Sequence, residues 1–363
     1  MIIKYQMLEK LFLLLMHKLP EELAHRIAIN LLKLKLIPPK KKIYSSLLET
    51  KIFGFVLSNP IGLAAGFDKN AEALPGLLHQ NFSYIEVGTV TPLAQYGNEK
   101  PRVFRVLPDK SIINKLGFPN IGEEKVFNNL KKIRKNHPLG KEPIIGVNIG
   151  CNKKTKNPLK DFEKCFETFY QVADYITINI SSPNTPGLRN LQYESKLIPL
   201  LKGISLQRDL FNKKIKRKIP LILKISPDLQ KKDIKSIVDL SIKYKFQGII
   251  ATNTTIKRKL AFTNNIGSLE GGASGKVLFP EANKTLKYVK EYAKDKIEII
   301  GVGGVNNSYT LLHKISLGAN AIQLYTALVY QGMGLIEEIL LDLIKKQKKS
   351  GNKKLSELIG KND

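Results

Sequence analysis

The amino-acid sequence predicts an α/β protein built on a (β/α)8 TIM-type barrel with an N-terminal helical extension. Eight short apolar runs rich in β-branched residues follow one another between residues 61 and 325, mostly separated by helical stretches. Polar residues stand at the C-terminal end of each run. In a barrel these strand ends converge on one mouth, which is the face that carries active sites.

The first part of the chain, residues 1–40, is typical of a pair of amphipathic helices. Pro20, Glu21 and Glu22 form a favourable helix start, because Pro fits the first turn and acidic side chains suit the positive end of the helix dipole. Apolar residues then recur at helical spacing, at Leu23, Ile27, Leu31 and Leu34. The stretch LEKLFLLLMHKL supplies the preceding helix, and PPKKK (38–42) indicates a linker.

After this linker we expect the barrel over residues 45–345, followed by a polar C-terminal tail over 346–363. The apolar runs are nearly continuous rather than alternating, which suits parallel strands covered by helices. A doubly wound open sheet is the alternative, but it would spread the polar strand ends along one edge. The runs are IGLAAGF (61–67), YIEVGTV (84–90), IIGVNIG (144–150), YITINIS (175–181), LILKIS (221–226), GIIAT (248–252), IEIIGVG (297–303) and AIQLY (321–325).

The formal net charge of +28 raises the question of nucleic-acid binding, since clustered Lys and Arg neutralise phosphates. Only eight of the 59 basic residues are Arg, and the lysines are distributed along the whole chain. Specific nucleic-acid sites depend on Arg and on aromatic stacking. We therefore expect no nucleic-acid partner, although the charge favours an anionic membrane surface or an anionic substrate.

Two cysteines, Cys151 and Cys165, are too few for a disulfide framework and lack the C-x-x-C spacing of a metal or redox site. We expect no bound metal. A membrane-spanning helix needs about 20 mostly apolar residues, which the sequence does not offer. LFLLLM (11–16) is too short for the apolar region of a secretory signal.

Three glycine- or hydroxyl-bearing segments predict a phosphate site. GVGGV (301–305) ends the seventh run, YTA (325–327) ends the eighth, and GGASGK (271–276) lies in the expected loop after the sixth. Barrels commonly bind a phosphate with the loops after strands seven and eight. Glycines allow backbone N–H groups to approach the phosphate oxygens, and Thr326 adds a hydroxyl.

Two lysines are candidates for the chemistry of the mouth. Lys224 lies inside the apolar run LILKIS, where a lysine must be paired, lose its proton or face a polar cavity. The alternative is a side chain that reaches around the strand edge to water. Lys69 follows Asp68, so a structural ion pair is the alternative there.

Amides gather at the same strand ends and loops, at Asn114, Asn148, Asn179, Asn184 and Asn253. Each presents a donor beside an acceptor, which complements rings with alternating N–H and C=O groups, such as a pyrimidine or a flavin. For one asparagine alone, a turn or strand-end cap is the more common role. Ser182, in NISSPNTPGLR (179–189), stands before Pro183, where a hydroxyl that caps the turn is the corresponding alternative.

Ten blocks together give a resemblance to the class 2, quinone-dependent dihydroorotate dehydrogenases. The resemblance extends from about residue 45 to the end of the chain, in the order and approximate spacing of the family. The blocks are AAGFDKNAE, EVGTVTPLAQYGNEKPRVFR, NKLGFPN, GVNIG, NISSPNTPGLRNLQ, LKISPDL, ATNTT, GGASGKVL, GVGGV and QLYTALVYQG.

This resemblance implies oxidation of (S)-dihydroorotate to orotate in de novo pyrimidine biosynthesis, with FMN as first electron acceptor and a membrane quinone as second. It implies that FMN is held by Ala65, Gly66, Lys69, Thr89, Asn148, Asn179, Lys224, Thr252, Gly275, Gly304, Tyr325 and Thr326. It places the substrate against Lys69, Asn114, Lys115, Leu116, Gly117, Phe118, Asn179, Asn184, Asn253 and Thr254.

Ser182 matches the catalytic base of the family. A serine is a poor base at its ordinary pKa, so its proton must leave through water or a neighbour such as Thr185. One alternative function is that of the similar class 1 enzymes, which use a cysteine as the base and pass electrons to fumarate or to a partner subunit. A second alternative is a 2-hydroxy-acid oxidase, which needs a catalytic histidine at a strand end. The class 2 resemblance implies no obligate partner subunit.

The resemblance also assigns a role to the N-terminal helices, which form the quinone entrance in class 2 enzymes. His25, Arg105 and Tyr325 would line the quinone tunnel. An amphipathic helix pair with flanking lysines suits peripheral membrane association, and simple packing on the barrel is the alternative. Without an Arg- and Ser-rich presequence, we expect the cytoplasmic side of a bacterial inner membrane.

Overall fold

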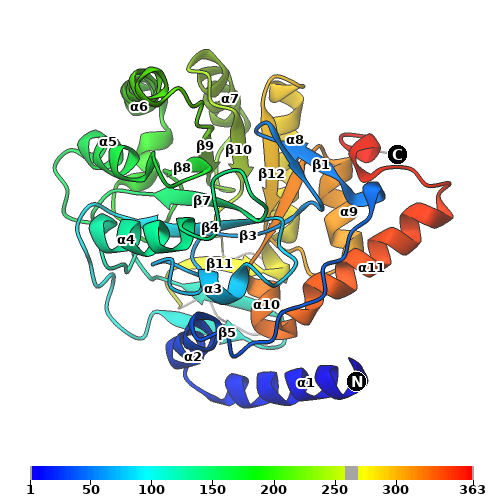
Figure 1. Ribbon diagram of the computed structural model, residues 1–363. Helices are drawn as coiled ribbons and strands as arrows, with labels where there is room; N and C mark the ends of the chain where they lie inside the picture. Colours follow the sequence, from blue (N-terminus) through cyan, green and yellow to red (C-terminus); the bar gives the residue numbers. More distant parts are fainter. Residues whose placement is uncertain (1, 258–268, 362–363) are drawn as a thin grey trace.

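The computed structural model describes residues 2–257 and 269–361 and contains a closed barrel of eight parallel strands (Figure 1). The ring closes where β13 pairs with β3, with Ile322 beside Ile61 and Leu324 beside Leu63. Each predicted run supplies one strand, so the predicted fold class is confirmed. The strands, in ring order, are β3 (Ile61–Leu63), β4 (Tyr84–Val90), β7 (Ile144–Ile149), β8 (Tyr175–Asn179), β9 (Leu221–Ile225), β10 (Gly248–Ala251), β12 (Glu298–Val302) and β13 (Ala321–Leu324).

Helices cover the outside of the barrel, and α5 shows why they form where they do. Its first turn contains Pro158, and the Asn157 side chain caps it by accepting a hydrogen bond from the Lys160 N–H. Phe162, Cys165, Phe166 and Phe169 then bury one stripe at helical spacing. The outer helices are α3 (Leu74–Leu77), α4 (Glu123–Arg134), α5 (Pro158–Phe169), α6 (Glu194–Ile215), α7 (Lys231–Lys243), α8 (Phe279–Ala293), α9 (Ser308–Ser316), α10 (Thr326–Gln331) and α11 (Gly334–Lys349).

A short hairpin of β1 (Thr50–Ile52) and β2 (Phe55–Leu57) packs on the N-terminal end of the barrel. The ring of Phe53, at its turn, lies 5.7 Å from the ring of Tyr175. Both belong to an apolar cluster that contains interior residues of seven barrel strands. This end of the barrel is therefore filled with side chains, and the open end is the mouth formed by the strand C-termini.

A second sheet, of three antiparallel strands, lies beside the mouth. It consists of β5 (Val103–Val106), β6 (Ser111–Asn114) and β11 (Gly272–Gly275), with Gly272 opposite Asn114. The segment GGASGK, expected as a loop, is thus mostly the edge strand β11. Its glycines allow this close pairing, because a Cβ on Gly275 would lie 2.5 Å from the Lys110 carbonyl oxygen.

The N-terminal region forms the two predicted helices, α1 (Ile2–Lys18) and α2 (Glu21–Lys33), outside the barrel next to β5 (Figure 1). Leu11, Leu14 and Leu15 on α1 are each more than half exposed. Within the two described ranges, no helix is long and apolar enough to cross a membrane.

The C-terminal stretch is packed more closely than the expected polar tail. Helix α11 continues to Lys349, and Leu355 in the following 3-10 turn is 1% exposed. This turn contacts α9 and β1. The expectation of a tail rests on the Lys-rich, polar composition of residues 346–363, which does not reveal one buried leucine.

Candidate active site

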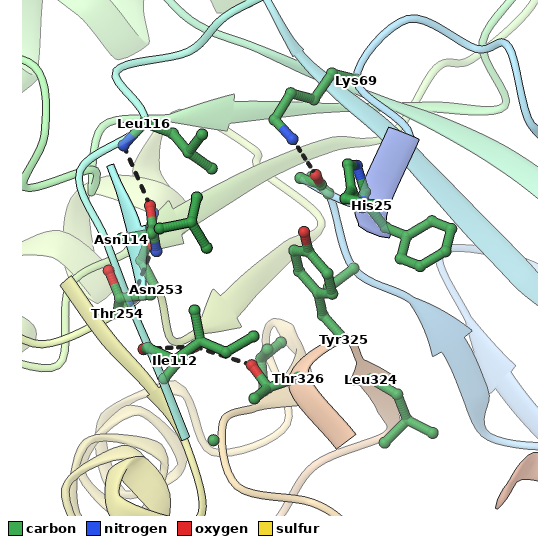
Figure 2. Close-up of a pocket in the computed structure, with 18 of the residues that line it drawn as sticks. His25, Lys69, Ile112, Asn114, Leu116, Asn253, Thr254, Leu324, Tyr325 and Thr326 are labelled. Carbon is green, nitrogen blue, oxygen red and sulfur yellow. Dashed lines mark hydrogen bonds between the residues drawn. The ribbon is translucent and has the colours of Figure 1, made fainter. Parts of the chain in front are cut away.

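The strand ends open into a cavity of about 480 Å3, enclosed by the mouth, the three-stranded sheet and α2 (Figure 2). Most of the predicted site residues line this one space. They are His25, Ala65, Gly66, Lys69, Thr89, Asn114, Leu116, Gly117, Phe118, Asn179, Ser182, Asn184, Lys224, Thr252, Asn253, Thr254, Gly275, Gly304, Tyr325 and Thr326.

Three predicted residues do not reach the cavity wall. Asn148 lies beneath it, in contact with Thr89 and Asn179. The Lys115 ammonium is instead 3.4 Å from Glu270. The Arg105 guanidinium donates to the main-chain oxygens of Met16 and Leu19 and so fastens the end of α1. Two other arginines, Arg26 and Arg102, do line the cavity.

A chain of amides and hydroxyls forms the floor of the cavity. Asn148, on β7, accepts hydrogen bonds through Oδ1 from the Thr89 hydroxyl at 2.6 Å and from Asn179 Nδ2 at 3.1 Å. Asn179, at the end of β8, accepts through its own Oδ1 from the Ser181 hydroxyl at 2.8 Å. Each side chain is buried, and these mutual bonds satisfy polar atoms that have little contact with solvent.

Lys224, on β9, brings a cation to this floor. It is 5% exposed and, among the described residues, makes no ion pair. Burial lowers the pKa of Lys224, and the nearby carboxylate of Glu86 opposes that effect. The side chain lines the cavity, so it does not reach around the strand edge to the protein surface.

Lys69 supplies a second cation from the loop after β3. Its ammonium donates to the Gly66 carbonyl oxygen at 2.6 Å, and burial lowers its pKa to about 8. The alternative role of Lys69, a structural ion pair with Asp68, is not seen: the Lys69 ammonium does not contact the Asp68 carboxylate. Asp68 instead accepts hydrogen bonds from the backbone N–H groups of Asn70, Glu72 and Ala73, and burial raises its pKa to about 6.

The expected phosphate end lies where β11, β12 and β13 meet the cavity. Gly303 and Gly304 have φ values of 107° and 77°, which favour glycine. A Cβ on Gly304 would lie 2.4 Å from that of Phe279, so only glycine fits there. The Thr326 and Ser274 hydroxyls are 2.9 Å apart. This group combines hydroxyls and exposed backbone without an acidic side chain, as an anion requires.

Across the cavity, three asparagines line the wall: Asn114 at the end of β6, and Asn184 and Asn253 in the loops after β8 and β10. Asn184 Nδ2 donates to Asn114 Oδ1 at 3.1 Å, and Asn253 Nδ2 donates to the Ser181 hydroxyl at 2.9 Å. Figure 2 shows Asn114 and Asn253 on the side opposite Lys69. The cavity therefore has amides on one side and a cation on the other.

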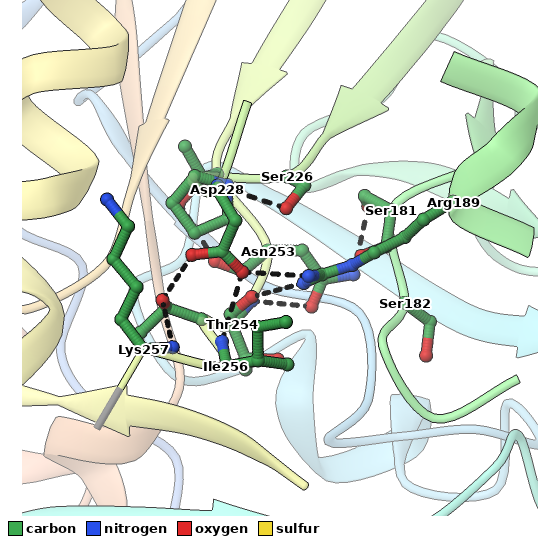
Figure 3. A network of polar contacts seen from close by, with 12 residues as sticks. Ser181, Ser182, Arg189, Ser226, Asp228, Asn253, Thr254, Ile256 and Lys257 are labelled. Atoms are coloured by element: carbon green, nitrogen blue, oxygen red, sulfur yellow. Dashed lines mark hydrogen bonds and ion pairs between the residues drawn. The ribbon is translucent and has the colours of Figure 1, made fainter. Parts of the chain in front are cut away.

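Ser182 opens into the same cavity and is 5% exposed. Its oxygen accepts from the Asn184 backbone N–H at 3.2 Å, as the turn-capping alternative expects, but no described residue accepts the hydroxyl hydrogen. Figure 3 shows the hydroxyl directed away from the neighbouring polar network. The Thr185 hydroxyl nearby is buried and has no hydrogen-bond partner among the described residues.

The loop that carries Ser182 is held in place by Arg189, which the sequence analysis did not single out. Its guanidinium donates to the carbonyl oxygens of Ser181 at 3.0 Å and Thr254 at 2.9 Å, and to Asp228 at 2.7 Å (Figure 3). Three loops, after β8, β9 and β10, thus share one ion pair. Arg189, Asp228 and Thr254 are far apart in the sequence, so no local sequence pattern predicts that they meet.

Helix α2 brings His25 against the mouth. The His25 ring meets the edge of Phe67 at 5.5 Å, and Phe67 in turn lies 5.7 Å from Tyr325. Burial and the nearby Lys69 charge lower the pKa of His25 to about 3, so it is neutral near pH 7. Burial raises the pKa of Tyr325 to about 12. This part of the cavity wall is aromatic, and the Lys69 charge lies close to it.

Comparison with known proteins agrees with the geometry. A family model described as "Dihydroorotate dehydrogenase" matches residues 47–346. A dihydroorotate dehydrogenase (quinone) of Buchnera aphidicola subsp. Schizaphis graminum is 42% identical over 344 residues, covering 93% of this chain and 99% of the relative. Its counterpart in Haemophilus ducreyi is 43% identical over 325 residues, covering 89% and 95%.

Solved structures give the same answer. The ligand-free DHODH of Eimeria tenella superposes with a TM-score of 0.88 at 32% identity, covering 94% of this chain and 99% of that one. The complex of the Eimeria enzyme with ferulenol gives a TM-score of 0.87, also at 32% identity, covering 94% and 95%. The chain therefore belongs to the dihydroorotate dehydrogenase family, in its class 2, quinone-dependent branch.

Proposed function

We propose that this protein oxidises (S)-dihydroorotate to orotate in de novo pyrimidine biosynthesis, transferring hydride to FMN and then electrons to a membrane quinone, with Ser182 as general base. The observation that carries the proposal is one cavity that joins a cationic floor at Lys224, an anion-type pocket at Gly304 and Thr326, and the Ser182 hydroxyl. FMN, when bound, supplies the two-electron chemistry that no side chain can provide.

The residues present fit FMN. The cavity volume lies within the range of about 300–1,000 Å3 typical of ligand sites. Gly275, Gly304 and Thr326 would receive the phosphate, and Lys224 would lie at the ring with Thr89 and Asn179. A fixed ammonium stabilises negative charge that develops on a reduced ring. The buried Gln323 Oε1, which has no hydrogen-bond partner among the described residues, is an acceptor of the kind that a ring N–H requires.

On the substrate side, Lys69 would offset the carboxylate of dihydroorotate, and Asn114, Asn184 and Asn253 would pair with its ring amides. Ser182 would take the proton from C5 while the hydride leaves C6. Because its hydrogen is not donated to a described residue, the hydroxyl is free to pass that proton on, through water or Thr185. This step would be favoured once FMN and the substrate fill the cavity and displace most of its water.

A cysteine base, as in the class 1 rival, is not supported. Cys151 and Cys165 are both buried and outside the cavity wall. Burial raises the pKa of Cys151 to about 12 and raises that of Cys165 above its ordinary value. Neither thiol would form a thiolate near pH 7.

We further propose that the quinone enters between α2 and the mouth, beside His25, Phe67 and Tyr325, from the cytoplasmic side of a bacterial inner membrane. The aromatic rings of this part of the wall suit an apolar quinone. The exposed leucines of α1 suit shallow insertion into the headgroup region, and the cationic surface would add attraction to anionic lipids.

The test is a steady-state assay of orotate formation from dihydroorotate with one electron acceptor at a time. The proposal predicts rapid turnover with a short-chain quinone and little with fumarate. A preference for fumarate would contradict the proposed second substrate. Absence of orotate with every acceptor, from protein loaded with FMN, would contradict the proposed reaction.

A further inference from the structure

Glu86 is a carboxylate buried inside the barrel, in the middle of β4, and is 0% exposed. Four side chains donate hydrogen bonds to it. Asn148 Nδ2 reaches Oε1 at 2.8 Å. The other oxygen, Oε2, receives the Tyr175 hydroxyl at 3.1 Å, the Thr177 hydroxyl at 3.0 Å and Gln323 Nε2 at 3.1 Å.

Only an all-acceptor side chain satisfies these four donors. A carboxylate has two oxygens with about four lone-pair positions, whereas a glutamine would bring an NH2 group against at least one donor. An ionised carboxylate without a directly bonded cation is costly to bury. The four donated hydrogen bonds offset part of this cost.

Glu86 also decides which way two amides above it point. Because Asn148 uses its Nδ2 on Glu86, its Oδ1 faces Thr89 and Asn179 and accepts from both. Asn179 must then present its nitrogen to Asn148, which leaves its oxygen for Ser181. In the same way Gln323 uses its nitrogen on Glu86, so its oxygen stays without a partner in a side chain that lines the cavity.

We infer that Glu86 is the positioning residue of the cofactor site: it fixes the donor and acceptor directions of Asn148, Asn179 and Gln323. It does not touch the cavity, so it acts through these residues. The inference rests on the proposed FMN site, because two of the fixed amides, Asn179 and Gln323, line the cavity that would hold the flavin ring, and Asn148 lies directly beneath it. It implies that the cofactor site depends on a residue outside its wall.

The test is FMN affinity of Glu86→Gln, a change that keeps size and shape. The new NH2 group has two possible orientations. If it faces Asn148, the Asn148 amide has to rotate by half a turn, and its Nδ2 then points at Asn179 Nδ2. If it takes the place of Oε2, it points at three donors. Loss of about one hydrogen bond raises the FMN dissociation constant roughly tenfold. We also expect a shifted visible absorption band of the bound flavin, because hydrogen bonds to the ring would change.

A matched control separates positioning from general damage to the buried cluster. Thr177→Val removes one donor to Glu86 without turning any amide. We expect it to lower the melting temperature yet leave the FMN dissociation constant and flavin spectrum close to those of the wild type. An equal loss of FMN affinity in Thr177→Val would reduce Glu86 to a structural role and overturn the inference.

The rescue variant is Glu86→Gln with Asn148→Asp, which exchanges the amide and the carboxylate. The amide introduced on β4 then donates to one oxygen of the carboxylate introduced on β7, and the other oxygen still accepts from Thr89 and Asn179. We expect this pair to recover FMN affinity relative to Glu86→Gln alone, even if that single variant folds poorly. No recovery, or wild-type affinity in Glu86→Gln, would overturn the inference. If the wild-type protein bound no FMN, the proposed function, on which this inference rests, would be overturned instead.

Discussion

Arg102 donates two hydrogen bonds to Glu22 Oε1, from Nε at 3.0 Å and from Nη2 at 2.8 Å. This pair joins α2 to the start of the three-stranded sheet, and Arg102 is only 5% exposed. Arg26 adds a second link, from α2 to Glu72 at 3.0 Å. Helix α2 is thus held over the mouth by charged contacts as well as by apolar packing.

We predict that Glu22→Ala weakens the quinone site more than the dihydroorotate site. Loss of a charge-assisted contact should cost about 2 kcal/mol in unfolding free energy. The KM for a short-chain quinone should rise, while flavin reduction by dihydroorotate in a single turnover keeps its rate. Lys235→Ala, which removes an exposed pair on α7, is the control and should change neither. Equal effects on both half-reactions would contradict this role.

Ser182→Ala should leave FMN bound and slow the reduction of the flavin by about 100- to 10,000-fold, the usual contribution of a general base. The hydroxyl is the group that would remove the C5 proton, and alanine keeps the loop because Arg189 holds it through the Ser181 carbonyl. Stopped-flow absorbance under anaerobic conditions measures the rate. An unchanged rate would remove Ser182 from its assigned role.

Lys224→Met should yield a folded protein that has lost most of its FMN. The substitution removes the one described cation on the cavity floor but keeps an unbranched side chain, so circular dichroism should still report an intact barrel. Flavin released by denaturation, relative to protein, measures the content. A wild-type ratio of flavin to protein would show that Lys224 does not retain the cofactor.

Activity should fall at alkaline pH because of Lys69. Its pKa is lowered to about 8, so the free protein loses this positive charge as the pH rises through that value. The protonated form binds the substrate carboxylate, so kcat/KM for dihydroorotate should be constant below and decline above about pH 8. Lys69→Arg should move the decline to higher pH. If kcat/KM of the variant still declined near pH 8, the decline would be caused by the titration of a group other than Lys69.

The eight barrel strands could be predicted from sequence because each is a continuous buried run. The signal that identified Lys224, a charge inside such a run, is also present at Glu86 in YIEVGTV, which the sequence analysis did not single out. Strand β11 was missed because it is mostly glycine and serine, a composition typical of loops. Pairing with β6 across the fold decides its structure, and no local pattern records that partner.

Predicted residues were placed best where a strand end fixed them. Thr89, Asn179 and Lys224 each belong to a barrel strand, and all reach the cavity. Arg105 lies on β5, outside the barrel, and its guanidinium donates hydrogen bonds at the end of α1 instead of reaching the cavity. The Arg189–Asp228 pair joins loops that are 39 residues apart, which only the folded chain reveals.

The most direct test of the proposed reaction is an anaerobic visible spectrum of the purified protein, recorded before and after addition of dihydroorotate and again after a short-chain quinone. We expect a flavin spectrum that bleaches with dihydroorotate and returns with the quinone. Protein loaded with FMN that does not bleach with dihydroorotate would contradict the proposed reaction at this cavity.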